Sequence, residues 1–327
     1  MFSFRKIPFL ALLALLSSLA VAEPVAGRLL AEGRVDDAIV SLQSRISSVP
    51  NDAESHNLLC RAYFIIGEWN SGIAACEKAV LLDPSNSQYH LWLGRIYGEK
   101  AEQANFLAAA GLAKKVHNEF EAAVHLDPNN AAARTDLAEF YLEAPDIVGG
   151  GRDKAAEQAA KLASLDVVKA GWIKARIAEK NKDFAGAEND YRSAVEASHG
   201  RADAWINLAR FYRDRGRFDD MANAIQHVSS AQVTQPEMLM DAAQVVIRSG
   251  RDLPAAVQLL RRYLSSSSTV EAAPVVKAHY LLGTLLEQQG DNRAAAGEYR
   301  AALSLVKGFS RAQSALDRLN RQVAETQ

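Results

Sequence analysis

The chain lacks most of the features that mark enzymes and nucleic-acid-binding proteins. Its 327 residues include only two cysteines, and 37 Lys and Arg against 39 Asp and Glu leave a net charge of −2. Nucleic-acid-binding domains normally carry a basic excess, so this balance argues against that class. Glycine (19) and proline (9) are scattered rather than clustered. We therefore expect no long disordered tail.

Catalytic and cofactor-binding motifs are missing as well. The sequence contains no nucleophile elbow, no HExxH and no dinucleotide-binding fingerprint. Aromatic residues make up 7% of the chain and fall mainly at repeated positions, which indicates packing rather than a cofactor pocket. We predict a protein that is not an enzyme and that has no catalytic residues, no cofactor and no metal.

Long hydrophobic runs are absent except at the N-terminus. Arg5 and Lys6 precede an uncharged apolar run from Ile7 to Ala22, which ends in the small-x-small sequence Ala20-Val21-Ala22. This pattern predicts a secretory signal peptide over residues 1–22, cleaved after Ala22; an uncleaved anchor is the alternative. No cysteine follows the run, so a lipid-anchored end is not expected. The sequence also lacks Asn-x-Ser/Thr, which favours a bacterial envelope, periplasmic or secreted, over a eukaryotic secretory route.

The stretch from Ala53 to Pro84 organises the rest of the chain. Its apolar residues recur at intervals of three and four, which predicts two amphipathic helices. Gly67 interrupts the pattern between them, and Pro84 ends the second helix. A hairpin of this size cannot bury its apolar stripe alone, so it must stack on copies of itself.

Copies of this hairpin are found by counting from successive prolines. Pro50 and Pro84 are 34 residues apart, and Pro128 begins a third copy. A small residue on the first helix would let the second pack closely, and an aromatic would fill the space between successive hairpins. Ten residues after each proline the chain has Cys60, Gly94 and Ala138, and thirteen residues after each it has Tyr63, Tyr97 and Tyr141.

These positions resemble the tetratricopeptide repeat (TPR), and the resemblance covers residues 23–308. The positions that match are Leu59, Tyr63, Gly67, Ala79 and Pro84 in one unit, Leu208, Ala209, Tyr212 and Gly216 near Trp205, and Leu282, Gly283, Gly290, Ala295, Tyr299 and Ala302 in the last. The resemblance implies an all-α fold: a right-handed superhelical solenoid of about eight stacked antiparallel helix hairpins. Residues 309–327 would add a capping helix with Ala312, Ala315, Leu316 and Leu319 facing inward.

Two units depart from the 34-residue period. The unit 87–128 is ten residues too long, and we expect an extended first helix that projects at one side. The next unit is five residues too long, and its excess is the glycine-rich loop 143–152. Together these insertions resemble a subset of exported bacterial TPR proteins. A serine-rich joint at 265–269 precedes the last hairpin.

Two short motifs could in principle bind ligands. The amides of Gly149-Gly150-Gly151, before Lys154, could cradle a phosphate, but the spacing is not that of a P-loop and no strand precedes it, so a long turn is favoured. His117, Glu121 and His125 share one helix face, but two helical turns separate the histidines by about 12 Å, too far for one ion. A solvated face is the preferred interpretation.

Cys60 and Cys76 lie on the two helices of one hairpin. In an oxidising compartment they could form a disulfide. Small packed residues are typical of both positions, so two buried thiols are the alternative. The sequence leaves both open.

The inner wall of the solenoid is the candidate partner-binding surface. Three arginines beside apolar and amide groups suit a peptide or helix of some acidic character, although the same residues could be ordinary solvated ones. We predict an exported scaffold that binds a protein or peptide in its concave groove; the alternative is an accessory subunit of an envelope enzyme or polysaccharide-export complex, docking through the long unit and the glycine loop. The predicted groove residues are Asn57, Arg61, Leu91, Arg95, Thr135, Glu139, Ile206 and Arg210.

Overall fold

The computed structural model describes residues 25–230, 235–266, 271 and 274–325. The predicted signal peptide and most of the serine-rich joint lie outside these residues. Within them the chain forms seventeen α-helices and one 3₁₀ turn, with no strand. The elements are α1 Val25–Ala31, α2 Val35–Ser48, α3 Ala53–Ile66, α4 Trp69–Leu82, α5 Ser87–Glu102, α6 Phe106–Leu126, α7 Ala131–Glu143, η1 Asp146–Val148, α8 Arg152–Leu162, α9 Val167–Lys180, α10 Phe184–Ala197, α11 Ala202–Asp214, α12 Phe218–Ser230, α13 Glu237–Ser249, α14 Leu253–Leu264, α15 Val275–Gln288, α16 Asn292–Leu305 and α17 Ser310–Glu325.

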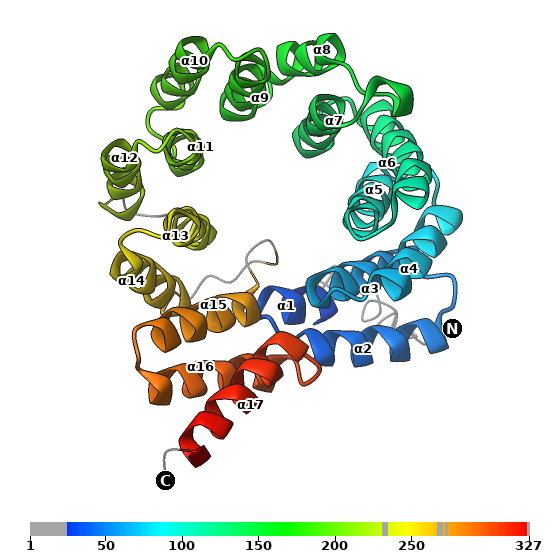
Figure 1. Cartoon of the computed structure of the whole chain (residues 1–327). Helices are drawn as coiled ribbons and strands as arrows, with labels where there is room; N and C mark the ends of the chain where they lie inside the picture. Colours follow the sequence, from blue (N-terminus) through cyan, green and yellow to red (C-terminus); the bar gives the residue numbers. More distant parts are fainter. Residues whose placement is uncertain (1–24, 231–234, 267–270, 272–273, 326–327) are drawn as a thin grey trace, which may run out of the picture.

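Consecutive helices pair into hairpins that stack in chain order, which confirms the predicted all-α solenoid. Figure 1 shows the odd-numbered helices α7, α9, α11 and α13 on the inner side and the even-numbered helices outside them. Helix α17 closes the stack with Ala312 and Leu319 buried at 0% and 2% exposure, while Arg311 and Arg321 face solvent. The right-handed sense of the superhelix stays a prediction.

The first complete hairpin begins and ends as the sequence predicts. The side chain of Asp52 accepts a hydrogen bond from the backbone N–H of Ser55 (3.2 Å) and so caps α3. Gly67 ends α3 in the left-handed conformation at φ 79°, which costs glycine little. The chain can therefore turn sharply into α4.

A small residue on the first helix of a hairpin leaves space for a large side chain from the second helix. A β-carbon added at Gly94 would lie 2.5 Å from the Phe120 ring, and one added at Gly283 would lie 2.6 Å from the Tyr299 ring. No real contact is that short, so any side chain at either glycine would push the two helices apart. This confirms the packing role predicted for the small position.

The tyrosine thirteen residues after each proline joins one hairpin to the preceding one. Tyr97 donates a hydrogen bond to Glu77 (2.5 Å), and Tyr141 donates one to Glu121 (3.0 Å). Tyr63 accepts instead, from the side-chain amide of Gln43 (3.3 Å). Each partner lies 20 residues earlier, on the second helix of the previous hairpin. The aromatic position therefore fills the space between hairpins, as predicted.

The side chain six residues after each proline bonds to that proline's carbonyl. The Nε2 atoms of His56 and His90 lie 3.0 Å from the carbonyl oxygens of Pro50 and Pro84. Arg134 makes the equivalent bond, with Nε donating to Pro128 O at 2.6 Å. This bond secures the start of each of these first helices to the turn before it.

Both insertions form, but the first is not placed as predicted. Helix α5 is 16 residues long, whereas α6 has 21, against 14 in α4. Most of the extra length therefore extends the second helix rather than the first. The loop 143–152 contains η1 and packs on α6, where the ring of His117 lies 3.0 Å from a β-carbon added at Gly149. The loop therefore packs on the regular part of α6.

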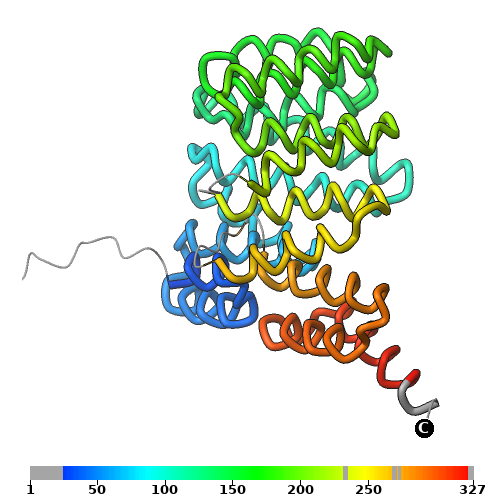
Figure 2. The backbone as a smooth tube through the Cα atoms, turned by 90° about the vertical axis from the view of Figure 1, so that its left-hand side faces the viewer, coloured from blue at the N-terminus to red at the C-terminus, as the bar shows by residue number. Residues whose placement is uncertain are grey.

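The two ends of the solenoid meet, so the hairpins form a ring (Figure 1). Helix α1 lies beside α15 in this view, and the side view in Figure 2 also places the N-terminal helices next to the C-terminal ones. A β-carbon added at Gly33 would lie 3.1 Å from Cβ of Val275. The backbone N–H of Lys307 donates to the Asp36 carboxylate at 2.8 Å. We call this junction the seam.

None of the described helices is long and apolar enough to span a bilayer.

Candidate functional site

The inner wall of the ring carries an aromatic side chain between two arginines. Trp92 on α5 has the guanidinium carbon of Arg61 at 5.1 Å from its ring centroid and that of Arg95 at 4.9 Å. Phe64 packs edge-on against Trp92 at 5.6 Å. Stacking on the indole face holds both guanidinium groups at the wall by cation–π attraction.

Each predicted groove arginine already has an acidic partner. Arg61 forms a two-pronged ion pair with Glu271, in which Nε donates at 2.8 Å. Arg95 donates to Asp136 on the next inner helix at 2.6 Å. Arg210 lies 3.8 Å from Asp241. Since these positive charges are neutralised within the chain, the wall does not offer three free cations to an acidic partner.

A sequence signal for two of these pairs existed but was not recognised. Arg95 and Asp136 are 41 residues apart, whereas Arg210 and Asp241 are 31 apart. The difference equals the ten extra residues of the long unit. The two ion pairs are therefore equivalent: in each, an arginine of one repeat pairs with an aspartate at the same position of the next repeat. The Arg61–Glu271 pair follows no such spacing, because it crosses the seam.

Three predicted groove residues are buried, so the prediction that they line the groove is wrong. Asn57, Leu91 and Ile206 are exposed by only 4%, 1% and 1%. Neighbouring inner helices pack side by side around the ring and cover these positions, which lie one turn before the arginines. Thr135 is half-buried, and its hydroxyl donates to the carbonyl of Ala131 at 2.7 Å.

Glu139 is the predicted groove residue whose charge the described residues leave unpaired. It is exposed and makes no hydrogen bond or ion pair within the described part of the chain. Even so, the protein that surrounds it in the ring raises the pKa of its carboxyl by desolvation, and the nearby carboxylates of Asp136 and Glu143 raise it further. Arg176 and Arg210 act in the opposite direction.

Other inner-wall carboxylates show the same trend. Burial raises the pKa of Asp241 and of Glu99, and Lys277 opposes the rise at both. Lys277 belongs to α15, whereas Glu99 belongs to α5. Groups from distant repeats therefore share one interior.

Comparisons with known proteins find similarity to tetratricopeptide-repeat proteins. The family model of the tetratricopeptide repeat matches residues 174–233 and 240–308. The chain contains tetratricopeptide repeats. It is 22% identical to mouse superkiller complex protein 3, in a match that covers 76% of this chain and 17% of that protein's length. Among solved structures, yeast Tom70 superposes with a TM-score of 0.54 at 14% identity, covering 89% of this chain and 59% of that one. A thermophilic TPR protein of Thermus thermophilus gives 0.47 at 20% identity, over 57% and 95% of the two chains.

Helix α3 does not provide the clamp by which chaperone-binding TPR domains hold a C-terminal carboxylate. That clamp needs an accessible lysine and asparagine at the places of Asn57 and Arg61. Here Asn57 is buried, and its side-chain oxygen has no hydrogen-bond partner within the described residues. Arg61 is held by Glu271. TPR proteins act in general as protein-interaction scaffolds.

The hairpin of α3 and α4 contains a disulfide. Cys60 on α3 and Cys76 on α4 are bonded, with Cα atoms 5.2 Å apart, and both side chains are fully buried. Of the two alternatives left open by the sequence, the disulfide is therefore the one that forms. It covalently joins the two helices of this repeat.

The glycine-rich loop is a turn and not a phosphate cradle. The amide of Gly149 donates to Asp146 O (3.0 Å), that of Gly150 to Pro145 O (3.2 Å), and that of Gly151 to Tyr141 O (2.9 Å). Gly150 also has no room for a side chain, since an added β-carbon would lie 1.9 Å from the Ala144 carbonyl oxygen. Because all three amides are used, none remains for an anion.

The histidine stripe on α6 is not a metal site. No group of three potential ligands that could hold a metal ion exists among the described residues. The predicted solvated face is wrong for His117. Its ring stacks on Phe140 with ring centroids 5.3 Å apart. Its Nε2 lies 3.1 Å from Glu121. This histidine therefore helps to hold α6 against α7.

Proposed function

We propose that the protein is an envelope scaffold that holds a segment of a partner protein against the inner wall of its ring. The exposed charges of the inner helices face one interior, while the remaining faces of these helices are buried in the stack. TPR proteins generally bind protein partners, so a peptide or a protruding helix is the expected occupant.

The partner segment should present a basic residue to Glu139. Each of the three groove arginines forms an ion pair with an acid of this chain. Glu139, in contrast, forms no ion pair within the described residues. A lysine or arginine from the partner would supply the missing positive charge in an environment that screens charges less than bulk water. The proposed partner segment is therefore basic, whereas the sequence suggested an acidic one.

Site-specific cross-linking tests this proposal. A photo-reactive residue at position 139 should capture one protein in intact cells, and mass spectrometry should place the cross-link beside a Lys or Arg. A synthetic peptide of that segment should bind the wild-type protein and lose about tenfold or more in affinity to Glu139→Lys. Glu196→Lys, at an exposed position on the outer helix α10, is the matched control. A cross-linked segment with no basic residue would contradict the proposal.

Binding should also depend on pH in a direction set by Glu139. Its raised pKa means that the carboxylate becomes protonated at a higher pH than an ordinary glutamate. Affinity for a basic segment should therefore fall as pH decreases through this pKa and should be full above it. Glu139→Gln should remove this dependence.

Docking through the two insertions is the second candidate, and one observation favours it. Ile147, Phe106 and Leu107 are the most exposed large hydrophobic side chains of the described residues, at 87%, 86% and 82%. All three lie in the insertions, where the chain departs from the repeat. Such exposure suits a partner that covers them. A photo-reactive residue at position 106 that captures a protein, with none captured at 139, would select this accessory-subunit function.

The envelope location rests on the N-terminal pattern and is supported by the disulfide, which persists in oxidising compartments. We expect Edman sequencing of the exported protein to begin at Glu23. A sequence that starts at Met1 or within the apolar run would contradict cleavage after Ala22.

A further inference from the structure

The most unusual charged side chain away from the inner wall is Arg134, on the side of α7 that meets α6 and α8. Its side chain is almost fully buried, with the residue 6% exposed, and the described residues place no carboxylate within ion-pair distance of it. Nε donates to Pro128 O at 2.6 Å, and Nη1 donates to the side-chain oxygen of Gln158 at 2.7 Å. Both acceptors are neutral. Burial accordingly lowers the pKa of the guanidinium.

The structural role of this position does not require an arginine. The equivalent residues, His56 and His90, make the same bond to the carbonyl of the preceding proline. An arginine adds a permanent charge and further N–H donors. Nη2 of Arg134 makes no hydrogen bond with the described residues. Nη1 is used by the fold, because it joins α7 to α8 through Gln158, whereas Nη2 and the positive charge have no hydrogen-bond or ion-pair partner among the described residues.

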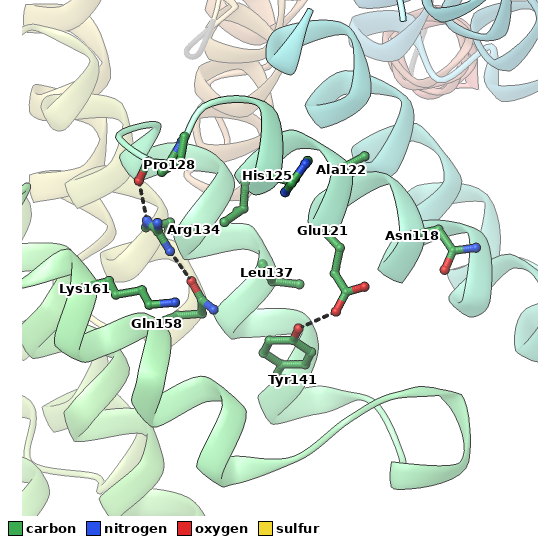
Figure 3. Close-up of a pocket in the computed structure, with 11 residues that line it drawn as sticks. Asn118, Glu121, Ala122, His125, Pro128, Arg134, Leu137, Tyr141, Gln158 and Lys161 are labelled. Carbon is green, nitrogen blue, oxygen red and sulfur yellow. Dashed lines mark hydrogen bonds between the residues drawn. The ribbon is translucent and has the colours of Figure 1, made fainter. Parts of the chain in front are cut away.

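Arg134 lines an open pocket of about 750 Å³ between α6, α7 and α8. Figure 3 shows Arg134, Gln158 and Lys161 together at one end of it. The ammonium of Lys161 makes no hydrogen bond or ion pair within the described residues. The side-chain amide nitrogen of Gln158 makes none with them either. Three kinds of N–H donor, two of them cationic, therefore meet, and no carboxylate of the described residues forms an ion pair with either cation, although Asp127 acts on Arg134 at longer range.

The other end of the pocket differs in character. Figure 3 shows Glu121 there, accepting a hydrogen bond from the Tyr141 hydroxyl at 3.0 Å, with Leu137 between the two ends. Glu121 also lies 3.1 Å from His117. Its negative charge is thus turned to partners of its own and away from Arg134.

We propose that this pocket binds a small molecule through a carboxylate or phosphate group held by Arg134, Gln158 and Lys161. Anionic oxygens accept charge-assisted hydrogen bonds from arginine and lysine, and the volume leaves room for more than the anionic group itself. The pocket opens between the outer helices α6 and α8, so this site is separate from the inner wall and does not depend on the function proposed for it.

Isothermal titration calorimetry at low ionic strength tests the proposal, with inorganic phosphate and succinate as the two probes. Wild-type protein should bind one equivalent of at least one probe, and the tighter probe identifies the anionic group. Sodium chloride at matched ionic strength is the blank. No heat above this blank for either probe would overturn the proposal.

The structure supplies a conservative variant, Arg134→His, which copies the residue used by two other repeats. It should keep the bond to Pro128 but lose the bond to Gln158, so circular dichroism must first show that the variant is folded, and it should weaken anion binding about tenfold to a hundredfold. Lys161→Ala leaves the fold contacts intact and should also weaken binding. Lys114→Ala, at an exposed position of α6 outside the pocket, is the control. Equal affinity in all three variants would overturn the proposal.

Discussion

Replacing Cys60 and Cys76 by alanine should lower the free energy of unfolding by about 3 kcal/mol, since this is the chain-entropy value for a closed loop of about 15 residues. The disulfide spans a sequence separation of 16, and both side chains are fully buried. Alanine removes only the sulfur atoms and introduces no polar group. Urea unfolding followed by circular dichroism measures the difference, and reductant should destabilise the wild-type protein by a similar amount without affecting the double variant.

Other repeats suggest a variant that should restore part of this stability without a covalent bond. Gly283 and Tyr299 are also 16 residues apart, and the tyrosine ring fills the space above the glycine. The disulfide therefore occupies the place of a small–large packing pair. Cys60→Gly with Cys76→Tyr should recover part of the loss and should be insensitive to reductant. If the alanine variant were as stable as wild type, the disulfide would have no role in holding the hairpin.

The repeat could be predicted from the sequence because its determinants are local. The residues at fixed distances from each proline act within one hairpin or between neighbours, as the Gly94–Phe120 and Tyr97–Glu77 contacts show. A single sequence contains this spacing directly. The capping glycine Gly67 and the inward residues of α17 were predictable for the same reason.

The candidate site was less predictable because it depends on how the repeats accumulate. Arg61 could be placed on an inner helix from its position in the repeat. Glu271 neutralises Arg61 only because the ring closes and brings together two residues that are 210 positions apart in the sequence. No local pattern encodes this closure. Small rotations between repeats add up around the solenoid. The burial of Asn57, Leu91 and Ile206 has a related origin, since it depends on how tightly neighbouring inner helices approach.

The seam should open when its polar contacts are removed. The Arg61–Glu271 ion pair and the Lys307–Asp36 bond involve charged groups, and a hydrogen bond of this kind contributes about 1.5–3 kcal/mol. Adjacent hairpins elsewhere in the ring pack along their helices, whereas across the seam α1 and α2 make only sparse contact with α15 and α16, and the Gly33–Val275 approach is one such contact. Arg61→Ala with Asp36→Ala should therefore shift the ring toward an open superhelix while every repeat stays folded.

Spin labels at Val40→Cys on α2 and Ser304→Cys on α16 would measure this opening by pulsed electron paramagnetic resonance, because both positions are exposed and the native cysteines are bonded. The closed protein should give one narrow distance distribution, and the double variant a broad, longer one with unchanged helical circular dichroism. Arg192→Ala, which breaks an ion pair to Glu188 within α10 and away from the seam, should leave the narrow distribution as it is. A narrow, unshifted distribution in the double variant would mean that apolar contacts alone close the ring, and that a partner must enter the interior from its open faces rather than through the seam.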